Sequence, residues 1–166
     1  GVNLWGVIHG IGAFVPVLVE QGEGHVVNTA SLAGLTSPGL LGPYNATKHA
    51  VVTLSETLFR DLESIGSPVG VSVLCPGFVN TRIASSDRNR PHWAPPVVRA
   101  DAAPLQEAVE TLVSGGMDAA DVARLVLDAV TAERFYILTH DDTAAMVATR
   151  MRDVLEGRNP SGAPLG

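Results

Sequence analysis

The sequence of 166 residues is poor in lysine, cysteine and basic charge. It has ten arginines but one lysine, Lys48, and its single cysteine is Cys75. One cysteine excludes an internal disulfide framework and any metal site built from several cysteines, and it fits a reducing compartment. Acidic residues outnumber basic ones by 17 to 11. A nucleic acid or an anionic membrane would demand a basic surface, so we expect neither partner.

Long hydrophobic runs are also lacking. A membrane span needs about 18 apolar residues, and the longest run, around 11–19, is interrupted by Gly12 and Pro16. No basic segment precedes an apolar stretch, so we expect no signal peptide and a cytoplasmic location. The hydrophobic fraction of 46% and the charged fraction of 17% exclude a disordered tail. The length fits one globular domain over residues 1–166.

Hydrophobic periodicity predicts helices that alternate with short apolar strands. Helices are expected at residues 3 to about 20, 43 to about 64, from Asp118 onward and at 142–156, and strands at 25–30, 69–74 and 135–139. The proline-rich residues from 78 to about 105 are expected to form a long loop, either without regular structure or with one short helix, and the tail 157–166 to be loose. Strands joined by helices predict an α/β fold with a doubly wound parallel sheet and helices on both faces.

Three parallel strands make an incomplete sheet, because an open apolar strand edge is a liability that natural proteins avoid. We therefore expect these residues to be the second half of a larger doubly wound domain. The alternative is a complete small domain with three strands.

Tyr44 and Lys48 are four residues apart at the start of the second predicted helix, which places both side chains on one face. An ammonium near a phenol favours the phenolate, and such a phenol can give a proton to a carbonyl oxygen or take one from an alcohol. The alternative is a solvated helix face, where such pairs are common. The spacing therefore predicts either an acid/base pair or a surface pair.

Two polar residues precede this pair. Ser31 follows the first predicted strand, 13 residues before Tyr44. The carboxyl ends of parallel strands are where open α/β sheets bind ligands, so the Ser31 hydroxyl could orient a substrate oxygen. Asn3 opens the first predicted helix, where its amide could cap the helix or hold a water. Each residue alone is more often a turn or cap residue, and only the joint spacing favours a site.

These segments together resemble the short-chain dehydrogenase/reductase family. Four parts match the family. They are Asn3, the stretch Val26-Val27-Asn28-Thr29-Ala30-Ser31-Leu32-Ala33-Gly34, the YxxxK pair of Tyr44 and Lys48, and the segment Pro76-Gly77-Phe78-Val79-Asn80-Thr81. The resemblance covers residues 1 to about 140 and the C-terminal half of the family pattern. It implies a Rossmann-type domain that uses NAD or NADP to interconvert a secondary alcohol and a ketone.

The resemblance also implies residue roles. Tyr44 would be the general acid/base, Ser31 would orient the substrate oxygen, and Asn3 would help to hold a proton-relay water. Lys48 would assist the tyrosine and bind the nicotinamide ribose. The residues implied in cofactor binding are Tyr44, Lys48, Pro76, Gly77, Val79 and Thr81. Residues 82–105 would form a substrate lid, and the first two long helices would form the interface of a homodimer or homotetramer.

The family's phosphate-binding glycine motif and its cofactor selector would precede Asn3 and are not among these residues. The isolated segment is therefore expected to bind a dinucleotide poorly. Two alternatives remain: an epimerase, dehydratase or lyase that uses the same Tyr/Lys pair, and a non-catalytic remnant that binds cofactor or oligomerises. No metal is expected, since the five histidines show no metal-ligand spacing.

Overall fold

A computed structural model describes residues 1–93 and 103–161, with the backbone alone at 103–105. These residues form two units, one from residues 1–77 with the chain from Arg124 onward and one from residues 78–123. The prediction of one domain over residues 1–166 stays a prediction.

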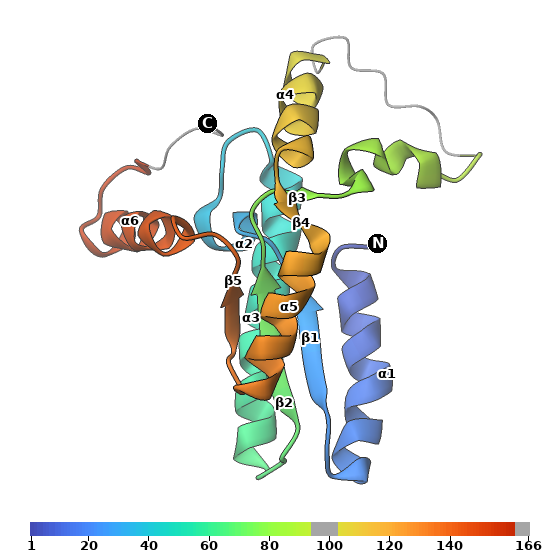
Figure 1. Cartoon of the computed structure of the whole chain (residues 1–166). Helices are drawn as coiled ribbons and strands as arrows, with labels where there is room; N and C mark the ends of the chain where they lie inside the picture. Colours follow the sequence, from blue (N-terminus) through green and yellow to red (C-terminus); the bar gives the residue numbers. More distant parts are fainter. Residues whose placement is uncertain (94–102, 162–166) are drawn as a thin grey trace. The chain divides into compact units, whose positions relative to one another are not determined.

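The first unit is built on a parallel sheet with the strand order β1-β2-β5 (Figure 1). Its strands are β1 (His25–Thr29), β2 (Gly70–Cys75) and β5 (Tyr136–Leu138). In register, His25 pairs with Gly70 at the amino end, and Cys75 pairs with Leu138 at the carboxyl end. All three strands were predicted, and their parallel arrangement confirms the α/β fold.

Helices cover both faces of this sheet, with α3 and α5 on opposite sides (Figure 1). The helices of the unit are α1 (Trp5–Gln21), α2 (Ala33–Thr36), α3 (Gly42–Ser64), α5 (Ala119–Thr131, which begins in the second unit) and α6 (Thr143–Leu155). The four long ones were predicted. The short helix α2 was not, because one turn leaves no periodic signal in a glycine-rich and serine-rich segment.

The core of the first unit lies between α3 and the sheet. Val51, Leu58 and Leu62 recur along one face of α3 and are buried. Leu58 and Leu62 pack in one cluster with Val71 of β2, and partly buried side chains of α1 close this cluster. Burying each of these aliphatic side chains stabilises the fold by about 1.5–3 kcal/mol. The packing fixes the start of α3 at the carboxyl end of the sheet.

The second unit has more regular structure than the long loop with at most one short helix that was predicted from 78 to about 105. It contains a parallel pair, β3 (Val79–Asn80) with β4 (Met117–Asp118), a 3-10 helix η1 (Arg82–Asn89) and α4 (Ala103–Ser114). Strands of two residues are too short to show alternation. In α4 the proline at 104 lies in the first turn, where proline is tolerated because its missing N–H has no helical partner. Part of the predicted lid, residues 94–102, lies outside the described residues.

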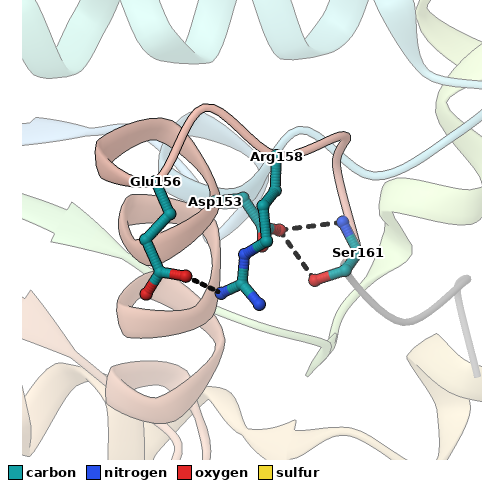
Figure 2. Close-up of polar contacts among 4 residues, drawn as sticks. All are labelled: Asp153, Glu156, Arg158 and Ser161. Carbon is teal, nitrogen blue, oxygen red and sulfur yellow. Dashed lines mark hydrogen bonds and ion pairs between the residues drawn. The ribbon is translucent and has the colours of Figure 1, made fainter.

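The C-terminal segment is bonded to α6 through a buried carboxylate (Figure 2). Asp153 Oδ2 accepts hydrogen bonds from the Ser161 backbone N–H at 2.8 Å and from its hydroxyl at 2.7 Å. These bonds lower the pKa of Asp153. Arg158 lies 3.6 Å from the other oxygen and 3.1 Å from Glu156. Of the tail predicted to be loose, residues 158 and 161 are thus tied to α6, and 162–166 lie outside the described residues.

Within the described ranges, no helix is both long and apolar enough to span a membrane.

Candidate active site

Three chain segments with polar residues meet at the carboxyl edge of the sheet. Ser31 follows β1, Gly77 follows β2 and His140 follows β5. The ladder between the first two segments continues past the strands, since the Leu32 backbone N–H donates to the Pro76 carbonyl at 2.9 Å. Because the strands are parallel, all three segments leave the sheet at the same edge, which is where ligands bind in open α/β sheets.

Tyr44 and Lys48 lie together at the start of α3. The Lys48 Nζ is 5.7 Å from the centroid of the Tyr44 ring, within the range of a cation–π contact. It also donates a hydrogen bond to the backbone carbonyl of Thr29, the last residue of β1, at 3.1 Å. Burial lowers the pKa of Lys48. The bond to Thr29 holds the ammonium at the carboxyl edge of the sheet, beside the phenol.

Tyr44 and Asn3 line the same surface hollow of about 410 Å³. The N-cap position of α1 is Leu4, and no side chain caps this helix. The alternative role of Asn3 as a helix cap is therefore wrong. The structure brings Asn3 to the hollow beside the phenol.

Ser31 forms a tight turn with the residues that follow it. Its Oγ accepts a hydrogen bond from the Ala33 backbone N–H at 3.2 Å, a local contact typical of serine turns. Among the described residues, no hydrogen bond joins Ser31 to Tyr44 or Lys48. The hydroxyl keeps its own proton and a second lone pair for another partner.

Gly34 sets how closely this turn approaches α3. A Cβ on Gly34 would lie 2.7 Å from the Lys48 carbonyl oxygen, which real side chains do not tolerate. Glycine is needed here because two backbones touch. The consequence is that the turn carrying Ser31 packs directly against the turn of α3 that carries Lys48. Gly34 is part of the stretch that resembles the family, but the sequence alone did not predict this packing role.

The loop between Ser31 and Tyr44 is held by Asn45, which sequence analysis also missed. The Asn45 side-chain amide donates to the Pro38 carbonyl at 2.7 Å, and the residue is buried. Ser37 and Leu40 in this loop adopt positive φ angles of 57° and 64°. Such angles cost free energy in residues other than glycine, so the surrounding bonds must hold the loop in place. The one feature of the sequence that could have drawn attention to Asn45 is its place between Tyr44 and Lys48.

Cys75 ends β2 beneath the same edge and is buried. Burial raises the pKa of its thiol to about 12, although a hydrogen bond from the Ser31 backbone and the charge of Lys48 act in the opposite direction. A thiol with such a high pKa is a poor nucleophile. Cys75 is therefore a buried packing residue at the end of β2.

The remaining implied cofactor residues divide between the two units. Pro76 and Gly77 lie at the carboxyl edge, and the Gly77 backbone N–H donates to Thr139 Oγ1 at 3.3 Å. Val79 and Thr81 belong to the second unit, where Thr81 caps η1 by accepting from the Ile83 backbone N–H. Their role in cofactor binding stays a prediction. Within the described ranges, no three histidine, cysteine or acidic side chains are grouped to hold a metal ion.

Comparison with known proteins identifies the family. The model of the family described as short chain dehydrogenase matches residues 1–92, more than half of the chain. A crystal structure of a short chain dehydrogenase/reductase from Burkholderia phymatum in complex with NAD is similar, with a TM-score of 0.89 and 46% identity over 98% of this chain and 59% of that one. The chain therefore belongs to the short-chain dehydrogenase/reductase family and has its Rossmann fold.

Two curated relatives agree with this assignment. The 1-deoxy-11-beta-hydroxypentalenate dehydrogenase of Streptomyces avermitilis is 34% identical over 92% of this chain and 50% of the relative. The CLA biosynthesis dehydrogenase/reductase of Lactiplantibacillus plantarum is 27% identical over 98% of this chain and 58% of the relative. The chain thus spans about half the length of these relatives.

Proposed function

We propose that the whole protein is an oxidoreductase that uses NAD or NADP to interconvert a secondary alcohol and a ketone. The observation that carries this proposal is the placement of Lys48, whose Nζ lies 3.1 Å from the Thr29 carbonyl and 5.7 Å from the Tyr44 ring. A cation, a phenol and a strand end therefore meet at one point. Family membership supports this reading, because the relatives above are described as dehydrogenases or reductases.

The carboxyl edge fits the nicotinamide end of a dinucleotide. The Lys48 ammonium has three N–H groups, and the bond to Thr29 uses one of them, which leaves two for ribose hydroxyls. Pro76 and Gly77 lie directly after β2, at the carboxyl edge where open α/β sheets bind ligands. Lys48, Pro76 and Gly77 would hold this end, with Val79 and Thr81 joining them by resemblance to the family. When bound, the nicotinamide supplies or accepts the hydride.

The chain's own residues would handle the proton and the substrate oxygen. Tyr44 gives its phenolic proton to a carbonyl oxygen in reduction, or takes a proton from an alcohol in oxidation, with the Lys48 charge favouring the phenolate. Ser31 donates its hydroxyl proton to the same substrate oxygen and so orients it. Asn3, in the hollow that Tyr44 lines, holds a water that returns protons from solvent. The substrate is a small molecule with an alcohol or ketone group.

Two further properties belong to the proposal. We infer a homodimer or homotetramer formed through α1 and α3. The exposed apolar side chains of Trp5, Phe14 and Val17 on α1 support such an interface.

A cytoplasmic location is supported by the single cysteine, which is free and buried.

The test is Tyr44→Phe in the whole protein. The substitution removes one hydroxyl and keeps the ring that Lys48 contacts. Turnover should fall by about a hundredfold or more, as when a general acid is removed, whereas the affinity for the dinucleotide should change little. Unchanged turnover would contradict the proposal. Product formation without net change in nicotinamide absorbance would favour an epimerase or dehydratase, and a whole protein that binds neither dinucleotide would favour the non-catalytic remnant.

A further inference from the structure

The turn at Pro76 and Gly77 is fixed by two residues that follow β5. The Gly77 backbone N–H donates to Thr139 Oγ1 at 3.3 Å, and the same oxygen lies 2.7 Å from Nδ1 of His140. Thr139 is buried, with 6% of its surface exposed. Neither residue is part of the proton-transfer machinery proposed above, yet both contact the turn that would receive the cofactor.

The hydrogen bonds of this cluster fit two arrangements, because Thr139 Oγ1 either donates to His140 Nδ1 or accepts from it, depending on the tautomer of the ring. The Thr139 hydroxyl has a single proton and two lone pairs. When it donates that proton to His140 Nδ1, a lone pair stays free to accept the Gly77 N–H. This assignment makes Nδ1 an acceptor and places the ring proton on Nε2. In either arrangement, the three groups satisfy one another only while the hydroxyl of Thr139 is present.

The ring of His140 also fills the space beside Gly77. A Cβ on Gly77 would lie 2.9 Å from Nδ1 and 3.0 Å from Cε1 of the ring. The ring is in turn anchored through its backbone, because the His140 carbonyl accepts the Thr143 N–H at the start of α6 at 3.2 Å. The turn after β2 is therefore held from the neighbouring strand by a hydrogen bond and by direct packing.

We propose that Thr139 and His140 are positioning residues that hold the turn at Pro76 and Gly77 in the conformation that receives the nicotinamide end of the dinucleotide. The proposal rests on the function proposed above. It predicts that loss of the Thr139 hydroxyl weakens cofactor binding while the chemical step, which Tyr44 carries, is largely kept.

The experiment compares Thr139→Val with Thr139→Ser in the whole protein. Valine has nearly the shape of threonine but leaves the Gly77 N–H and His140 Nδ1 unpaired. The Kd for NAD or NADP, measured by titration of protein fluorescence, should rise about tenfold, with kcat at saturating cofactor within about threefold. Serine should restore the Kd to within about threefold. The Gly77 amide should exchange faster with solvent in the valine variant alone.

Thr143→Val is a matched control. Thr143 is also a buried threonine of the same segment, and its Oγ1 has no hydrogen-bond partner among the described residues. Its substitution should leave both the Kd and the Gly77 exchange rate unchanged. An unchanged Kd in Thr139→Val, or an equal rise in both valine variants, would overturn the proposal.

Two further outcomes are decisive. If Thr139→Val does not fold, His140→Ala replaces it and should also raise the Kd, whereas an unchanged Kd would overturn the proposal. Failure of the proposed function is a separate result, because it is measured by turnover of Tyr44→Phe. Weakened cofactor binding in Thr139→Val would support the positioning role even if Tyr44→Phe kept its turnover. A protein that binds neither dinucleotide would overturn both.

Discussion

The two ends of the parallel sheet contain the same packing arrangement, a histidine ring against a glycine, in two different settings. At the amino end, the His25 ring fills the space that a side chain on Gly70 would need. Its Nε2 lies 2.7 Å from Ser72 Oγ, and the Ser72 hydroxyl donates to the Arg134 carbonyl at 2.7 Å. Each of these hydrogen bonds joins groups of the fold itself, so the cluster serves packing.

At the carboxyl end, the corresponding glycine is Gly77 and the ring is that of His140. Here the hydroxyl of Thr139 accepts from the backbone of a turn, and the ammonium of Lys48 and the phenol of Tyr44 lie at the same end. The comparison teaches that similar side chains acquire different roles from their position, because the carboxyl ends of parallel strands present turns and side chains to a ligand.

The largest expected difference between the two ends is in kcat/KM, when the two cations of α3, Lys48 and Arg60, are replaced in turn. Lys48→Met should lower kcat/KM by about a hundredfold or more, because it removes the charge that favours the phenolate. The matched control is Arg60→Met, which removes an exposed cation nearer the opposite end of the same helix and should leave kcat/KM within about twofold. Steady-state kinetics of the whole protein measure both. Equal losses in the two variants would contradict the role of Lys48.

The glycines give the next comparison. Gly77→Ala and Gly70→Ala should each destabilise the fold by about 1–3 kcal/mol, because each new Cβ meets a histidine ring. Only Gly77→Ala should raise the Kd for the dinucleotide. Adding His140→Ala to Gly77→Ala should recover part of the lost stability, since contacting residues are not additive. Denaturant unfolding and cofactor titration test this, and strictly additive effects would argue against the contact.

Ser72→Ala isolates the amino end. It leaves the Arg134 carbonyl and His25 Nε2 without their partner in a buried site, and it should cost about 1–3 kcal/mol of the free energy of unfolding. The Kd for the dinucleotide should stay unchanged. A substantially weaker affinity in this variant would mean that the two ends are not independent.

The smallest effect is a pH dependence at His25. Burial lowers the pKa of His25, and the opposing charge of Glu133 is the lesser influence. The unfolded chain, with a histidine pKa of about 6.5, then takes up the proton before the folded chain does. Stability from this group is present above about pH 6.5 and is lost as the pH falls through the folded value. His25→Gln should show a smaller loss of stability between about pH 7 and pH 5 in denaturant titrations, and an identical loss would contradict the assignment.

The sequence predicted the long elements because their apolar residues repeat at helical or strand spacing. Val51, Leu58 and Leu62 in α3 are an example. The sequence could not predict β3 and β4, since two residues carry no period, and their pairing depends on Gly116 lying against the Phe78 backbone. For α4, prolines favoured a loop, although proline in a first turn is compatible with a helix.

In the candidate site, too, some features could be predicted from the sequence and others could not. The spacing of Tyr44 and Lys48 predicted that they share a helix face, and the structure places the ammonium over the ring. The Thr29 carbonyl that receives Lys48 and the close approach at Gly34 could not be predicted, because they depend on how α2 and α3 pack at the end of β1. The spacing in the sequence was therefore enough to predict the Tyr44/Lys48 pair, whereas the groups that surround the pair are determined by tertiary packing.

The most direct test of the central claim is a crystal structure of the whole protein with its dinucleotide and an alcohol or ketone substrate bound. The account predicts that Tyr44 Oη and Ser31 Oγ both lie about 2.6–3.2 Å from the same substrate oxygen, with Lys48 in contact with the ribose. A substrate oxygen bound by other groups, with the Tyr44 hydroxyl directed away from it, would contradict the account.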